Sequence, residues 1–290
     1  MLENPYGDLT GGQWLRGNLH THTDRSDGEM TPQQVINDYA TRGYDFLSIA
    51  DHDIFHGPDE YAEFDDRGML LIAGNEMSAR GPHVLHLGGD RHIESTADRQ
   101  KVIDDVNATA GFVIVNHPNW RANFDGCPLA EMERLDGYIG MEIYNAIISR
   151  TPGSPYATNK WDQLLSAGRR LWGLANDDAH IESDVEKGWN MVYVNERSVE
   201  AVLDAVRRGR FYASSGVTIR HIEVDGLHVR LETDNAQRIV ALQRHGQRVA
   251  HVDDHAMEVD ASPESGYLRF ECWGPGESFA WTQPMFVAGA

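Results

Sequence analysis

Short apolar runs alternate with helix-like segments from the N-terminal region to about residue 210. Apolar runs bounded by turn residues are typical of strands. Eight such runs predict strands: "WLRGNLHTH" (14–22), "DFLSIAD" (45–51), "MLLIAGNEM" (69–77), "HVLHLGG" (83–89), "GFVIVNH" (111–117), "YIGMEIYN" (138–145), "RLWGLAND" (170–177) and "WNMVYVN" (189–195). Strands that alternate with helices favour a largely parallel α/β layer, which we expect to form a barrel.

Local end signals define two helices between these strands. Thr31 as N-cap, Pro32 at the first helical position and Gln34 form the pattern of a capping box, and Gly43 follows as a stop signal. A second helix is predicted after Ser198, because apolar residues recur there at helical spacing. Its apolar stripe consists of Val199, Val202, Leu203 and Val206.

The pattern changes after "GRFYASSG" (209–216). From about Thr218 onward, alternating segments such as "HIEVDGLHVRLE", "RIVALQRHG" and "YLRFECWG" are separated by Gly, Asp and Pro. Such alternation predicts strands joined by turns, and therefore a small antiparallel β module. The sequence thus predicts an α/β domain over residues 1–215 and a β-rich module over residues 216–290.

Charge and cysteine content narrow the function classes. The 290 residues include 45 acidic and 25 basic ones, for a net charge of −20. Nucleic-acid binding needs a basic surface, so we expect a small-molecule substrate and no nucleic acid. Cys127 and Cys272 are far apart, which predicts no disulfide framework and a reducing, cytoplasmic location. Neither a signal peptide nor a membrane segment is expected, and the oligomeric state is left open.

Metal-competent side chains fall near the ends of the predicted strands. His20 and His22 share one face of a strand, because residues i and i+2 point to the same side. Alone, this motif also fits a solvated strand face followed by an ordinary Asp-Gly turn at 27–28. The order of the whole set favours a metal site, since successive strand ends of a parallel barrel meet at one rim. The set comprises His20, His22, Asp27, His52, Glu76, His83, His86, His117, Asp178 and His180.

The type and number of donors constrain the metal. Imidazole and carboxylate donors without thiolate suit divalent Zn, Mn or Fe. Roughly nine ligands exceed the number that one tetrahedral ion uses, so we expect two or three ions, with Glu76 or Asp178 as bridges. The remaining histidines lie off the strand ends or in the β module, and we expect them to be structural or surface residues: His56, His92, His221, His228, His245, His251 and His255.

These ordered motifs resemble the PHP (polymerase and histidinol phosphatase) superfamily of metal-dependent hydrolases, whose motifs begin with H-x-H and end with D-x-H. The resemblance spans residues 16 to about 215. The segments "WLRGNLHTHTDRSDG", "GNEMSARGPHVLHLGG", "MEIYN", "GRFYASSG" and "AWTQPMFV" are similar to the branch that includes carbaryl hydrolase, which carries a trailing β region. The resemblance implies a distorted (β/α)7 TIM-like barrel and the metal ligands His20, His22, Asp27, His52, Glu76, His83, His117, Asp178 and His180.

Two histidines compete for the ligand position in "GPHVLHLGG". In a strand, His83 and His86 point to opposite faces, and this geometry alone does not choose between them. The family spacing places the ligand directly after the Gly-Pro pair, seven residues past Glu76, at His83. Relatives often carry Asn shortly after that histidine, where this chain has His86. We expect His86 to be packed or hydrogen-bonded beside the metal ligands.

The resemblance favours a phosphoesterase that acts on a small phosphomonoester or phosphodiester. Clustered divalent ions activate water and stabilise developing negative charge, so a metal-activated hydroxide from bound water is the expected nucleophile. No separate side-chain nucleophile is expected, because the chain lacks a G-x-S-x-G motif and Cys127 lies in a loop-like stretch. Arg25, Arg80 and Arg121 lie beside metal motifs and are the candidates for binding the substrate phosphate. The alternative for each of them is an ordinary surface position.

Three alternatives stay open. A hydrolase of carboxylic esters, carbamate esters or amides is favoured by the branch-level resemblance. An enzyme of the amidohydrolase superfamily also begins with H-x-H, but none of Lys101, Lys160 and Lys187 lies in a predicted strand to provide its bridging carboxylated lysine. The third alternative is a metal-stabilised, non-catalytic binding module whose β region contacts a glycan or another protein.

Overall fold

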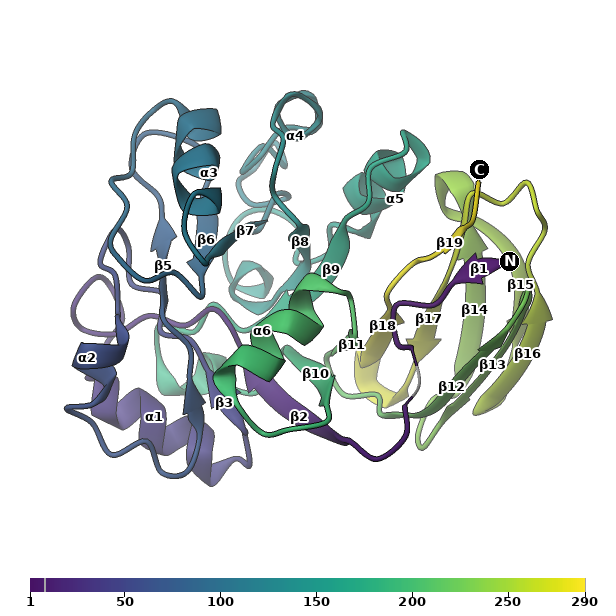
Figure 1. The fold of residues 1–290 in the computed structure, drawn as a ribbon, viewed down its shortest axis with the longest axis horizontal. Coiled ribbons are helices and arrows are strands. Elements are labelled where there is room, and N and C mark those ends of the chain that lie inside the picture. The colour runs from purple at the N-terminus through teal and green to yellow at the C-terminus, as the bar shows by residue number, and fades with distance from the viewer. Residues whose placement is uncertain (8, 290) are drawn as a thin grey trace.

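The computed structural model describes residues 1–7 and 9–289, which form a mixed α/β structure with three sheets. Figure 1 shows a helix-bearing region on the left and a β region on the right. The two termini meet in the β region, because β1 (Leu2–Glu3) pairs antiparallel with β19 (Met285–Val287). The mixed α/β class expected from the sequence is confirmed.

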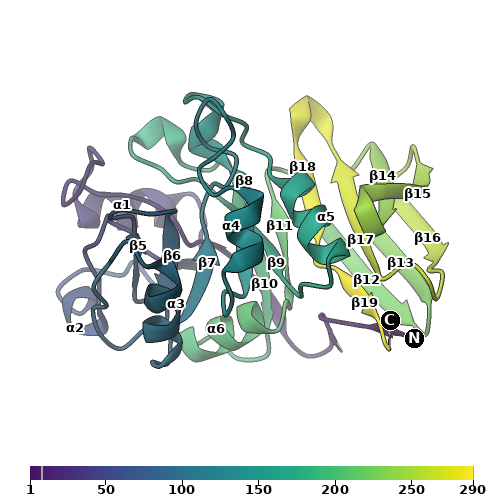
Figure 2. The same ribbon diagram turned by 90° about the horizontal axis from the view of Figure 1, so that it is seen from above.

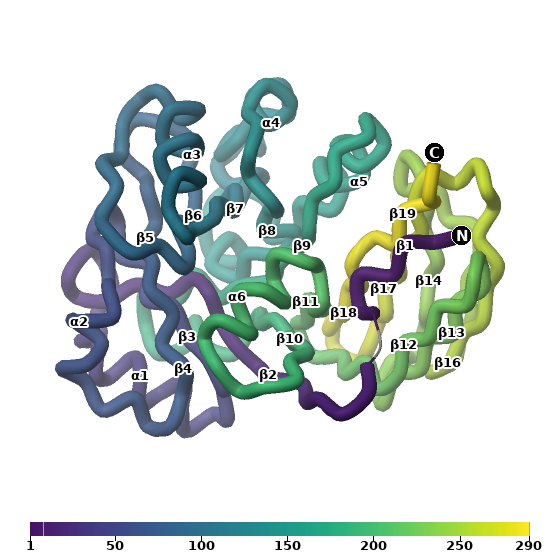
Figure 3. Tube along the Cα trace, in the orientation of Figure 1, coloured from purple at the N-terminus to yellow at the C-terminus, as the bar shows by residue number. Residues whose placement is uncertain are grey.

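The largest sheet has eleven strands and continues from one region into the other. β11 pairs antiparallel with β18, so the two regions share one hydrogen-bonded sheet. β1 lies in the β region whereas β2 lies in the helix-bearing region (Figure 3). Besides β1 and β19, the sheet contains β2 (Gln13–Asn18), β3 (Phe46–Leu47), β4 (Leu70–Leu71), β10 (Trp189–Val194), β11 (Phe211–Ser214), β14 (Arg238–Gln243), β15 (Gln247–Val252), β17 (Tyr267–Trp273) and β18 (Phe279–Thr282).

The two smaller sheets belong to one region each. The five-stranded sheet contains β5 (Gly74–Met77), β6 (Val84–Leu87), β7 (Phe112–Val115), β8 (Gly140–Asn145) and β9 (Trp172–Asn176). The three-stranded sheet contains β12 (Ile219–Asp225), β13 (His228–Thr233) and β16 (Ala256–Asp260). The α-helices are α1 (Pro32–Thr41), α2 (Pro58–Tyr61), α3 (Arg99–Asn107), α4 (Leu129–Arg134), α5 (Thr158–Ser166) and α6 (Val199–Arg207). Helix α3 packs on β7 and α5 packs on β8 (Figure 2).

Each of the eight predicted strand segments contains a strand, although several differ in extent. β2 ends at Asn18, so His20 and His22 follow the strand instead of lying within it as predicted. Only Phe46–Leu47 of "DFLSIAD" pairs as a strand, and "MLLIAGNEM" divides into β4 and β5. The predicted capping box of α1 is confirmed: the Gln34 amide donates to Thr31 Oγ1, and the Thr31 amide donates to Gln34 Oε1. Ser198 caps α6 as predicted, and Val202, Leu203 and Val206 of its apolar stripe are buried.

The expectation of a largely parallel layer needs correction at β6 and β10. β6 runs antiparallel to both β5 and β7, and β10 runs antiparallel to β2. Parallel neighbours need a crossover of a dozen or more residues. The segment 78–83 between β5 and β6 is too short for one, so the chain reverses there.

The strand ladders of the described residues form no closed barrel, because the five-stranded and eleven-stranded sheets are separate. Two isolated parallel bridges nevertheless join their ends. Thr21, after β2, pairs with Ala179, after β9, and His52, after β3, pairs with Glu76 in β5. Both bridges involve segments that carry candidate metal ligands.

Apolar side chains from both regions share hydrophobic cores. Trp281 and Phe286 pack with residues of the five-stranded sheet and its helices. Leu2 and Tyr6, near the N-terminus, belong to the core of the β region. The boundary between residues 1–215 and 216–290 therefore stays a prediction. None of the helices in residues 1–7 and 9–289 has the length and apolar character that crossing a bilayer requires.

Candidate metal centre

The nine side chains that the family resemblance implies as metal ligands converge on one place. They come from the segments after β2, β3, β7 and β9, from β5, and from the residue before β6. Their donor atoms form four overlapping groups, in each of which the atoms lie within 4.8 Å of one another. The groups are His22, Asp27, His52 and His180; His20, His117 and Asp178; His20, His22 and Glu76; and His52, Glu76 and His83.

Strand direction explains how distant residues meet here. β2 and β3 are parallel, as are β7, β8 and β9, so the segments after these strands leave from matching ends. His83 precedes β6, and the antiparallel direction of β6 brings this starting end next to β5 and β7. The reversed strand thus places His83 beside Glu76, with His83 Nδ1 3.2 Å from Glu76 Oε1.

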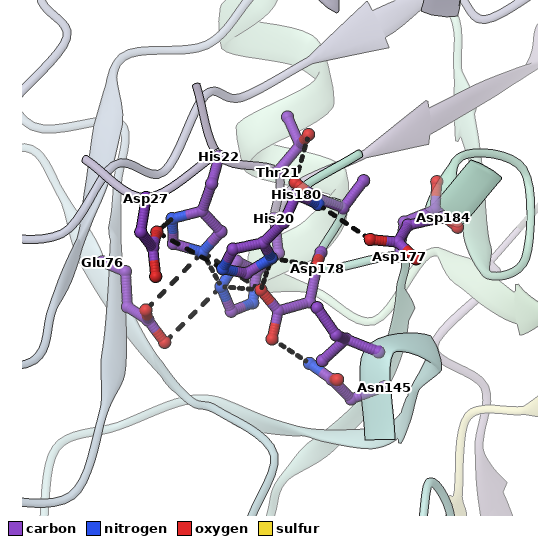
Figure 4. A network of polar contacts seen from close by, with 12 residues as sticks. His20, Thr21, His22, Asp27, Glu76, Asn145, Asp177, Asp178, His180 and Asp184 are labelled. Carbon is purple, nitrogen blue, oxygen red and sulfur yellow. Dashed lines mark hydrogen bonds and ion pairs between the residues drawn. The ribbon is translucent and has the colours of Figure 1, made fainter. Parts of the chain in front are cut away.

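The buried imidazole of His20 lies at the centre of the arrangement (Figure 4). Its Nδ1 lies 2.7 Å from Glu142 Oε1, and donation to this carboxylate leaves a lone pair on Nε2. That Nε2 faces His22 Nε2 at 3.1 Å, Asp178 Oδ1 at 3.2 Å and Glu76 Oε1 at 3.5 Å. Nitrogen and oxygen atoms that face each other at these distances in a buried site need either a proton or a metal cation between them.

Asp178 Oδ1 shows the same need for a cation. This oxygen is buried and lies 3.2 Å from His20 Nε2 and 3.0 Å from His22 Nε2. No hydrogen bond from the described residues reaches it. A buried carboxylate oxygen without a donor is costly. The donor set and this oxygen therefore fit a bound divalent cation.

A second set of donors surrounds Asp27, which is half exposed at the mouth of the site. Asp27 Oδ2 lies 3.4 Å from His52 Nε2, and Asp27 Oδ1 lies 3.3 Å from His180 Nε2. On the inner side, Glu76 Oε2 lies 2.8 Å from His52 Nδ1, and Glu76 Oε1 lies 3.0 Å from His117 Nε2. Glu76 thus contacts donors of both sets, as a bridging carboxylate would.

Carboxylates and imidazoles in this cluster shift one another's pKa values. Burial raises the pKa of Glu76 and Asp178, but the surrounding imidazoles hold the pKa of both carboxyls well below their usual range. Burial lowers the pKa of His20, yet Asp178 and Glu142 raise it well above its usual value. Likewise, burial lowers the pKa of His52, while Asp27 and Glu76 raise it to about 10. Cation binding would release such histidine protons.

Residues that support the cluster were missed in the sequence. Glu142 in β8 is buried and accepts from the His117 amide at 2.7 Å and from Asn145 and Asn176. It therefore fixes His20 and the segment of His117 at once. A charged residue inside the apolar run "YIGMEIYN" was the available signal, because a buried carboxylate needs partners.

A cavity of about 380 Å³ opens over the cluster. Trp120, Ile147 and Ile181 supply its apolar walls, and Arg150 lines it as well. Arg150 donates from Nε and Nη2 to Asp184 at 2.8 and 2.7 Å. Asp184 also accepts from the His180 amide, so the arginine is anchored to the segment that carries a candidate ligand.

The three arginines expected to bind phosphate do not line this cavity. Arg25 is exposed and forms an ion pair with Glu60. Arg80 and Arg121 line a neighbouring cavity instead. The sequence carries no signal for Arg150, because it lies five residues after the predicted strand 138–145 and beside no metal motif.

The other histidines lie outside the four donor groups. His86 is buried on the opposite face of β6 from Leu85, with Nδ1 3.3 Å from Asn75 Oδ1 and its ring stacked on Phe55. Burial lowers the pKa of His86 to about 4. His56 is buried with Nε2 2.7 Å from Asp51 Oδ2, which fits the structural role expected of it.

Comparisons with known proteins find relatives that are similar to parts of the chain. The chain is 36% identical over 86 residues to a 5'-3' exoribonuclease of Haemophilus influenzae, covering 27% of this chain and 31% of that protein. It is 38% identical over 73 residues to a 3',5'-nucleoside bisphosphate phosphatase of Chromobacterium violaceum, covering 24% of this chain and 26% of that protein. The matches thus span less than a third of these curated relatives. No family model matches the chain.

One solved structure is similar over nearly the whole chain. It is a two-domain protein of Bacteroides vulgatus, described as containing a predicted PHP-like metal-dependent phosphoesterase, with a TM-score of 0.59, 17% identity and coverage of 98% of both chains. The resemblance to PHP proteins is confirmed. At this identity the structural likeness establishes the fold, and the finer similarity to the carbaryl hydrolase branch stays a prediction.

Proposed function

We propose that the protein is a multinuclear metal-dependent hydrolase and acts as a phosphoesterase on a small phosphomonoester or phosphodiester. The observation that carries this proposal is the convergence of His20 Nε2, His22 Nε2 and Asp178 Oδ1 on one buried point. A purely structural cluster would pair each acceptor with a donor. The names of the two curated relatives support phosphate esters as the substrate class.

The four donor groups support two or three ions of Zn, Mn or Fe. The groups share His20, His22, His52 and Glu76, and these residues would hold the ions together with the other donors of each group. Divalent ions in this cluster would supply an activated water and neutralise charge on the phosphoryl oxygens. We propose all nine converging side chains as the ligands, with His83 rather than His86 as the ligand from the β6 segment.

The protein's own residues would bind and orient the substrate. Arg150, held by Asp184, presents a guanidinium to the cavity and would bind a phosphoryl oxygen. Trp120, Ile147 and Ile181 would contact the rest of the substrate and exclude water. Glu142 would hold the Nδ1 proton of His20, which keeps His20 Nε2 available as a donor atom.

We also propose that β2, β3 and β5 to β9 form the distorted barrel of PHP proteins. The bridges Thr21 to Ala179 and His52 to Glu76 support this arrangement, because they connect the two sheets at both ends. A small-molecule substrate is favoured over nucleic acid by the net charge of −20. Two buried, unpaired cysteines support a reducing compartment such as the cytoplasm.

Metal removal and reconstitution test the proposed function. Purified protein is analysed for metal content and assayed with aryl phosphates, phosphodiesters and carboxylic esters, before and after chelation and with added Mn, Fe or Zn. Chelation is expected to abolish phosphate-ester hydrolysis, and one of the metals is expected to restore it. Full activity in metal-free protein would contradict the metal role. Hydrolysis of carboxylic esters alone would show that the protein is a carboxylic esterase and not a phosphoesterase. Metal-dependent stabilisation without turnover would indicate a binding module.

A further inference from the structure

Two aspartates flank His52 in the segment "ADHD" (50–53), and the proposed ligand set uses neither of them. His52 itself belongs to two donor groups. The Asp27 group consists of His22, Asp27, His52 and His180, and the His83 group consists of His52, Glu76 and His83. The side chain of Asp51 is buried, and that of Asp53 is partly buried. A carboxylate removed from water needs hydrogen-bond donors, so the donors of each aspartate indicate which segment it holds in place.

Asp51 binds the loop that joins His22 to Asp27. Its Oδ1 accepts from the Thr23 amide at 2.7 Å and from Ser26 Oγ at 2.6 Å. Its Oδ2 accepts from Thr23 Oγ1 at 2.5 Å. Thr23 directly follows His22, and Ser26 directly precedes Asp27. One carboxylate therefore fixes both ends of this loop, next to two members of the Asp27 group.

His56 supplies the fourth hydrogen bond to Asp51. This histidine is buried, and its Nε2 donates to Asp51 Oδ2 at 2.7 Å. Its Nδ1 lies 3.2 Å from Glu60 Oε1 in α2. Burial raises the pKa of the Asp51 carboxyl, but the hydrogen bonds from His56, Ser26 and Thr23 lower it to about 2. Asp51 is therefore ionised at neutral pH and can accept from all four donors.

Asp53 binds a different loop, which joins Glu76 to His83. Its Oδ1 accepts from the Ser78 amide at 3.0 Å and from the Ala79 amide at 3.4 Å. Its Oδ2 accepts from Ser78 Oγ at 3.1 Å. The amide of Asp53 donates to the carbonyl oxygen of Glu76 at 2.7 Å. Asp53 therefore holds the start of the loop between the other two members of the His83 group.

Arg99 of α3 binds the same loop at a second point. Its side chain is buried, and its Nη2 donates to the carbonyl oxygen of Ala79 at 3.2 Å. Its Nη1 donates to Ser95 Oγ at 3.2 Å. The amide of Ala79 is thus bound by Asp53 and its carbonyl group by Arg99. Because Arg99 remains when Asp53 is replaced, we expect the loop to change its position without being released.

We propose that Asp51 and Asp53 are positioning residues for two different metal ions, Asp51 for the ion held by the Asp27 group and Asp53 for the ion held by the His83 group. This proposal rests on the metal-binding part of the proposed function and assigns it two further residues. Neither aspartate is itself a ligand, because each acts through the loop that carries the ligands. The segment "ADHD" thus supplies one ligand and two residues that hold the partners of this ligand.

Stepwise metal titration of single variants tests this assignment. Chelated full-length protein is titrated with Zn²⁺ in competition with a chromophoric chelator, and elemental analysis gives the number of bound ions. Asp51→Asn and Asp53→Asn are each expected to weaken one ion by about 10 to 100-fold, as is typical when a residue that orients metal ligands is lost, and to leave the other ions nearly unchanged. Asp66→Asn is the matched control, because exposed Asp66 also accepts from a backbone amide, that of Gly68 at 2.8 Å, but lies outside the donor groups.

Double variants identify the ion on which each aspartate acts. Asp51→Asn/Asp27→Ala is expected to weaken the same ion as Asp27→Ala and no other, because two substitutions at one site act on one equilibrium. Asp51→Asn/His83→Ala is expected to weaken two ions. For Asp53→Asn the two results should be reversed, with a shared effect for His83→Ala and separate effects for Asp27→Ala.

Milder variants keep the test valid if an asparagine variant folds poorly. Thr23→Val removes one hydrogen bond to Asp51, and Ser78→Ala removes one hydrogen bond to Asp53, so each should weaken the corresponding ion to a smaller extent. Circular dichroism and urea unfolding of the chelated variants measure folding separately from metal affinity.

The outcomes separate this proposal from the proposed function. Weakening of one ion by each aspartate variant supports the assignment even if no phosphate ester is hydrolysed, a result that would reject only the phosphoesterase. Weakening of the same ion by both variants, equal weakening of every ion, or unchanged Zn²⁺ affinities would overturn the assignment and leave the metal centre in place. A wild-type protein that binds no Zn²⁺, Mn or Fe would reject both proposals.

Discussion

At the scale of single residues, the site depends on which face of a short strand each side chain takes. His83 lies before β6 and joins Glu76 and His52 in one donor group. His86 lies within β6 and contacts Asn75 and Phe55 instead. Side chains alternate between the two faces of a strand, so residues three positions apart, such as His83 and His86, point to opposite faces.

Replacing each of these histidines should give different metal contents. His83→Ala is expected to lower the measured metal stoichiometry and nearly eliminate turnover, because a donor is lost from a three-residue group. His86→Ala is expected to keep the full metal count with a smaller loss in turnover than His83→Ala, because His86 contacts Asn75 and Phe55 and belongs to no donor group. Elemental analysis and circular dichroism of both variants check the prediction. Loss of an ion from His86→Ala alone would reverse the ligand assignment.

His86 should also make stability depend on pH. Its imidazole has a pKa near 6.5 in an unfolded chain, whereas burial lowers the pKa of folded His86 to about 4. Between these values the unfolded state binds more protons, so the free energy of unfolding decreases as the pH falls from 6.5 to 4. The whole shift corresponds to about 3 kcal/mol.

Urea unfolding of chelated protein at several pH values measures this effect. In His86→Gln the loss of stability across the window from pH 6.5 to 4 should be smaller than in wild type. His221→Gln is the control, because His221 is an exposed histidine of β12. If the unfolding free energy varied with pH equally in wild type and His86→Gln, His86 would not be the neutral, buried imidazole of the folded state.

At the scale of elements, helix α5 fixes the segment that follows β7. Lys160 of α5 is buried and donates from Nζ to the carbonyl oxygens of Pro118, Phe124 and Cys127 at 2.7 to 2.8 Å. Burial lowers the pKa of its ammonium group. This single side chain thereby positions the segment that carries Trp120 and Arg121.

Lys160→Met should therefore weaken both stability and substrate binding. Three carbonyl oxygens would lose a charged donor, which is expected to cost about 1 to 3 kcal/mol in unfolding free energy. Urea unfolding measures this loss, and KM is expected to rise because the segment that carries Trp120, a wall of the cavity, loses its anchor. Lys101→Met, at an exposed lysine of α3, should change stability by less than about 1 kcal/mol. Equal effects of the two substitutions would contradict this role for Lys160.

At the scale of the whole molecule, the β region is attached by a shared sheet, shared cores and a buried ion pair. Arg269 of β17 is buried, and its Nη2 lies 2.6 Å from Asp162 Oδ2 of α5. Tyr267 also donates to Asp162, at 2.7 Å. These contacts show why the β region matters to stability although every candidate metal ligand precedes residue 181.

Removing residues 218–290 should leave metal binding in any soluble product. Stability is expected to fall, because the truncation exposes apolar surface and leaves Asp162 without its partner. Arg269→Met serves as a milder variant, which should be less stable and keep the full metal count by elemental analysis. Loss of metal from a folded form of either protein would place part of the metal site in the β region.

The sequence alone determined the strand segments and the cap of α1, because these follow from local periodicity and capping chemistry. The set of nine candidate ligands came from the resemblance of the ordered motifs to a known family. Only the tertiary structure decided the direction of β6, the role of Glu142 and the positions of the arginines. Strand pairing and ion pairing join residues far apart in the chain, such as His20 with Glu142 and Arg150 with Asp184. No local pattern specifies such partners, because the free energy of these contacts exists only once the strands and loops have packed together.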